Sequence, residues 1–151
     1  MNKLKKIIAP TDLSKLSRPA VRYALEMAKE QGATVVVFHV ISQEGDWFGK
    51  DDGLNPASAF VPQQKERLHE FVKDNFADLV DKVMIQEIVE AGVPYNRIVK
   101  KAEEEKADLI VMSTHGRTGI EQIMLGSVTA KVVARAGCPV LSIRPAKSSA
   151  H

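Results

Sequence analysis

Residues 109–129 read LIVMSTHGRTGIEQIMLGSVT, and this stretch decides how the chain folds. It begins with the continuously apolar run Leu109–Met112, which suits a strand covered on both faces of a parallel sheet. A loop that contains Gly116 and Gly119 follows, and Gly126-Ser127 then opens a helical pattern. The order of strand, glycine-containing loop and helix is typical of an α/β protein.

Short β-branched runs alternate with amphipathic helical stretches through the rest of the chain. This alternation predicts an α/β fold, a single doubly wound domain over residues 1–146 with helices on both faces of a five-stranded parallel sheet. Residues 147–151 are small and polar, which predicts a flexible tail. The predicted strands are Leu4–Ala9, Thr34–Ile41, Val83–Glu90, Asp108–Ser113 and Val140–Ile143.

Four helices are predicted between these strands. Ser17 is placed to cap the first helix, whose first turn tolerates Pro19 and which ends at Gly32. The residues Ser42–Val61 interrupt the rhythm, and a loop of that length is usually functional or disordered. Of the other three helices, the second carries an apolar stripe over 68–79, the third starts at Pro94, and the fourth runs from Ser127 to Gly137.

Composition and charge limit the classes of function. The chain has 151 residues, 44% of them hydrophobic and 26% charged, which is typical of a soluble globular domain without a membrane span. Its net charge of +2 is too small for general binding to nucleic acid, so phosphate recognition must be local. The single Cys138 cannot form an internal disulfide, and the apolar run before Pro10 is too short for a signal peptide. We therefore expect a cytoplasmic protein.

The loop after the fourth strand and the start of the following helix form a candidate anion site. Backbone N–H groups and the positive end of a helix dipole meet there. Gly116 and Gly126 let the backbone approach a phosphate, and the hydroxyls of Ser127 and Thr129 can donate to its oxygens. Neither the G-x-x-x-x-G-K-[ST] motif nor the G-x-G-x-x-G motif is present. The alternative is that Ser127 is only a helix cap and the glycines are only turn residues.

A second loop, Ala9–Asp12, follows the first strand as Ser113–Gly119 follows the fourth. Ligands of open α/β sheets bind beyond the carboxyl ends of strands, where the winding reverses. If both loops serve one site, strands one and four are neighbours and the strand order is 3-2-1-4-5. Asp12 can then accept from an adenine amine or a ribose hydroxyl, or hold a metal ion on the phosphates. The alternative for Asp12 is a cap at the first helix.

These residues resemble the universal stress protein family, in the branch that binds ATP. The family fingerprint is G-x-x-G, nine residues, then G-[ST]. Gly116, the nine residues 117–125 and Gly126-Ser127 match its later part, while Ser113 stands in place of the first glycine. The similar stretches elsewhere are Lys5–Asp12, Phe38–Val40, Ala107–Met112 and Cys138–Leu141.

The resemblance implies the strand order 3-2-1-4-5 and a homodimer formed through the last strand, Val140–Ile143. It also implies an adenine nucleotide as ligand, ATP or else ADP or AMP, together with Mg²⁺ or Mn²⁺, which Asp12 would hold through the nucleotide. The nucleotide-binding residues that it implies are Pro10, Thr11, Asp12, Val40, Met112, Ser113, Thr114, His115, Gly116, Arg117, Thr118, Gly119, Gly126, Ser127, Val128 and Thr129.

Three functions follow as hypotheses. The first is a regulatory nucleotide-binding module of the stress response, acting as a homodimer with an unidentified protein partner. The second is a slow ATPase or autophosphorylating enzyme that uses Asp12 for metal, with Ser127 or Thr129 near the terminal phosphate. The third is a dimeric interaction protein without nucleotide, which Ser113 favours because its Cβ can crowd a ribose. His115 can touch the ligand or orient its loop through a backbone carbonyl.

Overall fold

The computed structural model describes residues 3–42, 57–115 and 126–145. Its centre is a five-stranded parallel sheet in the order β3-β2-β1-β4-β5, which confirms the predicted fold class and strand order. The strands are β1 (Lys6–Pro10), β2 (Thr34–Ser42), β3 (Met84–Gly92), β4 (Leu109–Ser113) and β5 (Val140–Ile143). The helices are α1 (Arg18–Gln31), α2 (Val61–Phe76), α3 (Pro94–Glu104) and α4 (Ser127–Arg135), with 3-10 turns η1 (Lys15–Ser17) and η3 (Ala57–Phe60).

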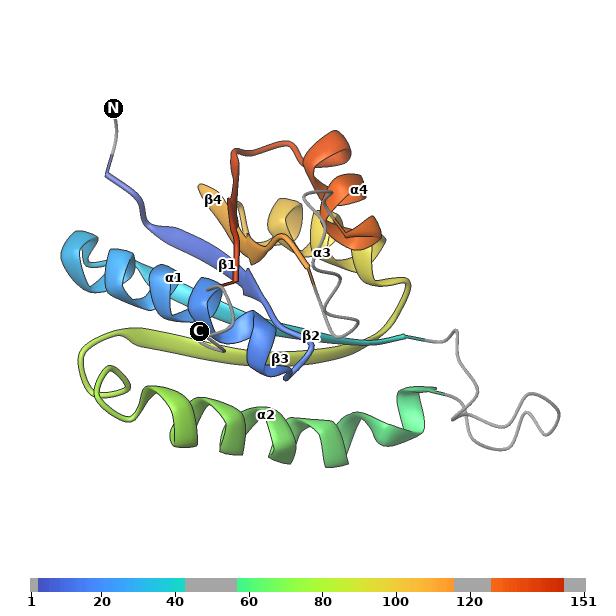
Figure 1. Ribbon diagram of the computed structural model, residues 1–151, viewed down its shortest axis with the longest axis horizontal. Helices are drawn as coiled ribbons and strands as arrows, with labels where there is room; N and C mark the ends of the chain where they lie inside the picture. The colour runs from blue at the N-terminus through green and yellow to red at the C-terminus, as the bar shows by residue number, and fades with distance from the viewer. Residues whose placement is uncertain (1–2, 43–56, 116–125, 146–151) are drawn as a thin grey trace, which may run out of the picture.

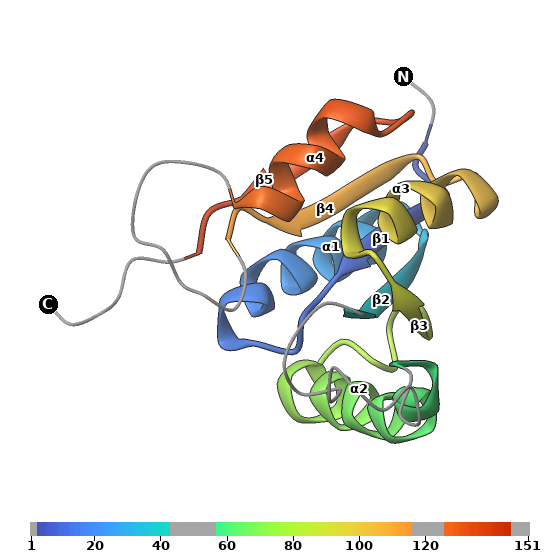
Figure 2. The same ribbon diagram turned by 90° about the vertical axis from the view of Figure 1, so that its right-hand side faces the viewer.

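Helices cover both faces of the sheet (Figure 1), and the turned view separates the two helical layers (Figure 2). Successive strand residues point to opposite faces. Ile7 and Val35 pack in the core with α1 and α2, whereas Ile8 and Val36 pack with α3 and α4. All four side chains are fully buried. Double coverage is therefore the reason why each central strand contains a run of consecutive apolar residues.

The first helix begins and ends where the sequence predicts, but one local expectation is wrong. Pro19 lies in its first turn, and Gly32 ends it in the left-handed region, with a φ of 71°. The side chain of Ser17 does not cap the helix. Its hydroxyl donates to the carbonyl of Ser14 and lies 2.7 Å from the hydroxyl of Thr11. Ser17 therefore ties η1 to the loop after β1.

Some predictions fall on residues 43–56, 116–125 and 146–151, which lie outside the described parts of the chain. These include most of the long loop after the second strand, the middle of the glycine-containing loop and the tail. Among the helices that are described, none is long and apolar enough to cross a membrane.

The winding of the sheet reverses between β1 and β4. From β1 the chain moves outward through β2 and β3 on one side, and then returns to β4 and β5 on the other. Because the loops after β1 and β4 leave in opposite directions, a crevice opens at their carboxyl ends.

Candidate functional site

A cavity of about 320 Å³ lies at this reversal point, within the size range of small-molecule sites. Loops after β1 and β4, the end of β2 and the starts of α3 and α4 contribute to its wall. The predicted residues that line it are Pro10, Thr11, Asp12, Val40, Met112, Ser113, His115, Gly126, Ser127, Val128 and Thr129.

Five of the predicted residues are not among those lining residues. Thr114 lies next to the cavity, where its amide donates to the carbonyl of Ile143 and its carbonyl accepts from the amide of Gly126. The other four, Gly116, Arg117, Thr118 and Gly119, fall outside the residues that the structure describes.

Gly126 stands where the start of α4 passes close to the end of β4. Its amide donates to the carbonyl of Thr114 over 2.7 Å. A Cβ at this position would lie 3.1 Å from that same oxygen and 3.6 Å from the Cα of His115. The absence of a side chain therefore lets α4 begin at the cavity wall, where the first amides of a helix have no partner within it. The positive end of the helix dipole adds to a favourable environment for an anion.

The two hydroxyls at the start of α4 differ in what they can do. The Oγ1 of Thr129 is buried and donates to the carbonyl of Ser113 over 2.7 Å, so it joins α4 to β4. Ser127 is exposed and lines the cavity. Ser127 is therefore better placed than Thr129 to donate to a bound oxygen.

The loop after β1 is held by its own polar side chains. The Oγ1 of Thr11 accepts from the amide of Leu13 over 2.9 Å, and Leu13 adopts a φ of 67°. The Oδ1 of Asp12 accepts from the amide of Ser14 over 3.0 Å and from the hydroxyl of the same residue. This is an Asx-turn, so Asp12 caps the turn before η1 rather than the first helix.

The described residues offer little for binding a metal ion without a nucleotide. They contain no group of three or more His, Cys, Asp or Glu that could hold an ion. Asp12 is the carboxylate in the described cavity lining. A Mg²⁺ ion prefers six oxygen ligands, so most of them would have to come from a nucleotide and water.

Sequence reasoning included Val40 of β2 but missed the rest of the wall that β2 and α3 contribute. His39 is buried, its Nδ1 donates to the carbonyl of Thr11, and its Nε2 lies 3.0 Å from Oε1 of Gln64 on α2. His39 thus joins β2, the loop after β1 and α2, in keeping with its interpretation as a core or rim residue. The lining residues that the sequence did not single out as a binding set are Ser17, Phe38, His39, Ile41, Ser42, Pro94 and Ile98.

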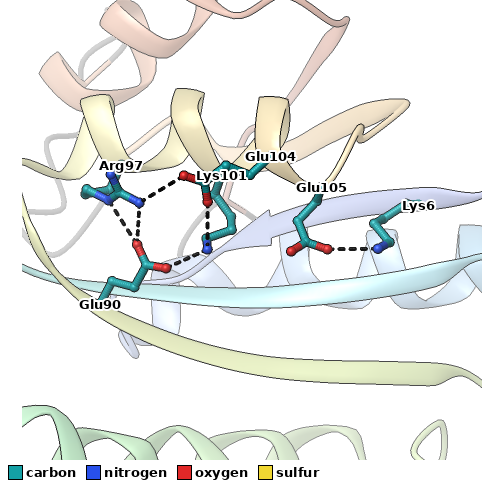
Figure 3. A network of polar contacts seen from close by, with 6 residues as sticks. All are labelled: Lys6, Glu90, Arg97, Lys101, Glu104 and Glu105. Carbon is teal, nitrogen blue, oxygen red and sulfur yellow. Dashed lines mark hydrogen bonds and ion pairs between the residues drawn. The ribbon is translucent and has the colours of Figure 1, made fainter.

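A cluster of ion pairs holds α3 against β3 beside the cavity (Figure 3). The carboxylate of Glu90 pairs with the Nη2 of Arg97 over 2.6 Å and with the Nζ of Lys101 over 2.5 Å. Glu104 pairs with both cations, and the Nζ of Lys101 lies 5.7 Å from the centroid of the Phe38 ring. Because Lys101 is only 8% exposed, its charge depends on these partners.

We expect Glu90→Gln to destabilise the protein at pH 7 by about 1.5–3 kcal/mol, the contribution of hydrogen bonds to charged groups. Burial raises the pKa of Glu90, but hydrogen bonds from Lys101 and Arg97 outweigh it and leave the pKa below its ordinary value of 4.5. The ionised carboxylate therefore stabilises the fold above that value, and this stability is lost as the pH falls below it.

Urea unfolding at pH 7 and at about pH 3 measures this difference. The stability gap between wild type and Glu90→Gln should narrow in acid. Asp74→Asn, at an exposed carboxylate of α2, is the control and should change little at either pH. A gap that is the same at both pH values would contradict the assigned role of Glu90.

The chain is similar in sequence to proteins of a known family. Residues 3–144 match the model of the universal stress protein family. The chain is 36% identical to the universal stress protein MJ0531 of Methanocaldococcus jannaschii, over 97% of this chain and 85% of that protein. It is also 30% identical to MJ0577 of the same organism, over 93% of this chain and 94% of that protein.

Solved structures share the fold. The structure of MJ0577 superimposes with a TM-score of 0.75 at 28% identity, covering 97% of this chain and all of that one. A universal stress protein solved in complex with cAMP gives a TM-score of 0.68 at 25% identity, covering 95% of this chain and 99% of the other.

Proposed function

The chain belongs to the universal stress protein family, and on that basis we propose that it is a regulatory module that binds an adenine nucleotide. One observation carries the proposal, which is that the loops after β1 and β4 and the start of α4 meet at one cavity. The apolar side chains of Phe38, Ile98 and Met112 suit a base, and the wall from Gly126 to Thr129 suits phosphate oxygens.

ATP with Mg²⁺ or Mn²⁺ is the proposed ligand, with ADP and AMP as alternatives. The relative solved with cAMP supports the adenine nucleotide. Pro10, Thr11, Asp12 and Val40 would surround the adenine and ribose. The residues of 112–119 would contact ribose and phosphates, and Asp12 would meet the metal ion that the nucleotide carries.

The proposal includes a homodimer formed through β5 and a protein partner that responds to the bound nucleotide. Within the part of the chain that the structure describes, β5 lies at an edge of the sheet, and the backbone groups on its outer side can pair with another strand. The starts of α3 and α4 line the cavity, so a bound ligand would contact both helices and a partner would sense its presence at their surfaces.

The proposal predicts that the purified protein carries an adenine nucleotide, which mass spectrometry of the released small molecules would identify. Calorimetry on protein stripped of nucleotide should then show saturable binding of ATP with Mg²⁺, and much weaker binding of CTP. A stripped, folded protein that binds no adenine nucleotide would contradict the proposal and favour the interaction protein without nucleotide.

The same preparation distinguishes a binding module from an enzyme. A module should release at most about one equivalent of phosphate or ADP per chain, because it lacks repeated turnover. Product that accumulates well beyond one equivalent, and that is lost in Asp12→Ala, would instead assign ATP hydrolysis to this site.

A further inference from the structure

The loop after β1 is anchored at the cavity through the backbone of Thr11. The amide of Thr11 donates to the carbonyl of Phe38 over 2.9 Å, and its carbonyl accepts from Nδ1 of His39 over 3.0 Å. Thr11 and His39 are both buried, and both belong to the cavity lining. The residue after Thr11 is Asp12, which carries the carboxylate of the described lining. His39 therefore fixes the backbone that carries this carboxylate.

The other ring nitrogen of His39 pairs with a helix that does not line the cavity. Its Nε2 lies 3.0 Å from Oε1 of Gln64 on α2, and Gln64 is only 5% exposed. Gln64 is not among the lining residues. A glutamine amide contains both a donor and an acceptor, so it can pair with Nε2 whether or not that nitrogen carries a proton. The hydrogen bonds from Gln64 through His39 to Thr11 thus join α2 to the loop after β1.

The burial of Gln64 needs an explanation, because the other buried residues of α2 are apolar. These are Leu68, Phe71, Val72 and Phe76. Burying an amide costs free energy unless it is hydrogen-bonded, and an apolar side chain would fill the same place without that cost. The hydrogen bond to His39 compensates Gln64, and a paired polar group in a core fixes one arrangement of the groups around it. The position of the Thr11 carbonyl is therefore specified from α2.

We propose that Gln64 and His39 are positioning residues for the nucleotide, which hold the carboxylate of Asp12, through the carbonyl of Thr11, at the place where the ligand meets it. This inference rests on the proposed function and adds to it a residue of α2 that the ligand does not touch. Coupling between two sites is reciprocal. A nucleotide that depends on this loop therefore also stabilises the contact between His39 and Gln64.

The first test replaces Gln64 by methionine, which keeps the length of the side chain and removes the amide. Nε2 of His39 then loses its partner, and the ring no longer fixes Thr11. Calorimetry on stripped protein should show an affinity for AMP about 5-fold lower or less, from the lower end of the range for coupled sites. AMP is the probe, so that no metal ion enters the comparison. Gln63→Met is the matched control, since Gln63 is exposed on α2, and it should bind AMP as wild type does.

A second control separates positioning from a loss of stability. Leu68 is fully buried on α2, in the core that α2 forms with the sheet. Leu68→Ala should lower the free energy of unfolding but keep wild-type affinity for AMP at a temperature where the variant is folded. A matching loss of affinity in Leu68→Ala would mean that instability explains the effect of Gln64→Met, and would overturn the inference.

A double-mutant cycle with Asp12→Asn tests whether Gln64 acts through Asp12. Asparagine keeps an oxygen that can accept from the amide of Ser14, as Asp12 does, but it lacks the charge. The double variant should bind AMP within about 2-fold of Asp12→Asn alone, the limit within which independent effects add. If Gln64→Met causes its full loss of affinity in both backgrounds, Gln64 does not position Asp12 and the inference is overturned.

The outcomes separate this inference from the proposed function. If Gln64→Met binds AMP as wild type does, the inference fails and the proposed function stands. If stripped wild type binds no adenine nucleotide, both fail. Should Gln64→Met unfold, nuclear magnetic resonance of the wild type decides. AMP must shift the side-chain amide signals of Gln64 and leave those of Gln63 in place, and unshifted signals of Gln64 overturn the inference.

Discussion

Gly126→Val is expected to weaken nucleotide binding at least about 100-fold, a loss of about 2.7 kcal/mol, while the fold is retained. The added Cβ would lie 3.1 Å from the carbonyl oxygen of Thr114, a backbone atom that cannot turn away as a side chain can. The start of α4 must then shift from β4 by a few tenths of an ångström, and the branched side chain adds bulk at a residue that lines the cavity. Because Gly126 has an extended backbone, with a φ of −64°, valine is tolerated by the chain itself.

Calorimetry with ATP and Mg²⁺ measures this loss, and far-ultraviolet circular dichroism checks the fold. Gly137→Val is the matched control. A Cβ at Gly137 would meet nothing within 4 Å, and this glycine follows the end of α4 that is opposite Gly126. It should bind nucleotide as wild type does. If folded Gly126→Val bound nucleotide with wild-type affinity, the start of α4 would not be part of the nucleotide site.

Phe38→Ala should lower the free energy of unfolding by about 3–5 kcal/mol and also weaken nucleotide binding. Phe38 is fully buried between the sheet and α3, and it lines the cavity. Truncation removes its contacts with the core and with the ammonium of Lys101, and it opens a void in the wall that a bound base would contact. We expect affinity to fall about 10-fold or more, since each 1.4 kcal/mol is a factor of ten.

Phe76→Ala is the paired control for this substitution. Phe76 is equally buried, but it packs in the other core, on α2, with its ring 5.7 Å from that of Phe71. Urea unfolding should show a similar loss of stability for the two variants. Calorimetry at a temperature where both are folded should show loss of binding for Phe38→Ala alone. Equal loss of binding in both would mean that instability, rather than the cavity wall, explains the effect.

Much of the fold follows from local patterns in the sequence. The run Val35–Phe38 is apolar at every position because each strand residue faces one of two helical layers. Glycine ends α1, and prolines open helices, because backbone geometry restricts these residues wherever they stand. The strand order also followed, once the loops after the first and fourth strands were assigned to one site.

The rest of the site could not be predicted, because it depends on distances across the fold. Pro94 and Ile98 reach the cavity because α3 crosses back from β3 over the face that holds Phe38. Thr129 donates to Ser113, so a hydroxyl predicted for the ligand serves the fold. The sequence does not predict this contact, because sixteen positions separate Thr129 from Ser113.

By itself the sequence determined the order of strands and helices and the positions of Gly126 and Asp12 in the loops that follow them. Those features depend on side-chain periodicity and backbone restrictions, which act between residues a few positions apart. Tertiary structure alone decided that Nε2 of His115 is left without a partner among the described residues, while both ring nitrogens of His39 are paired. Hydrogen bonding of a buried ring depends on which distant groups the folded chain brings within about 3 Å of it, and no local pattern encodes that distance.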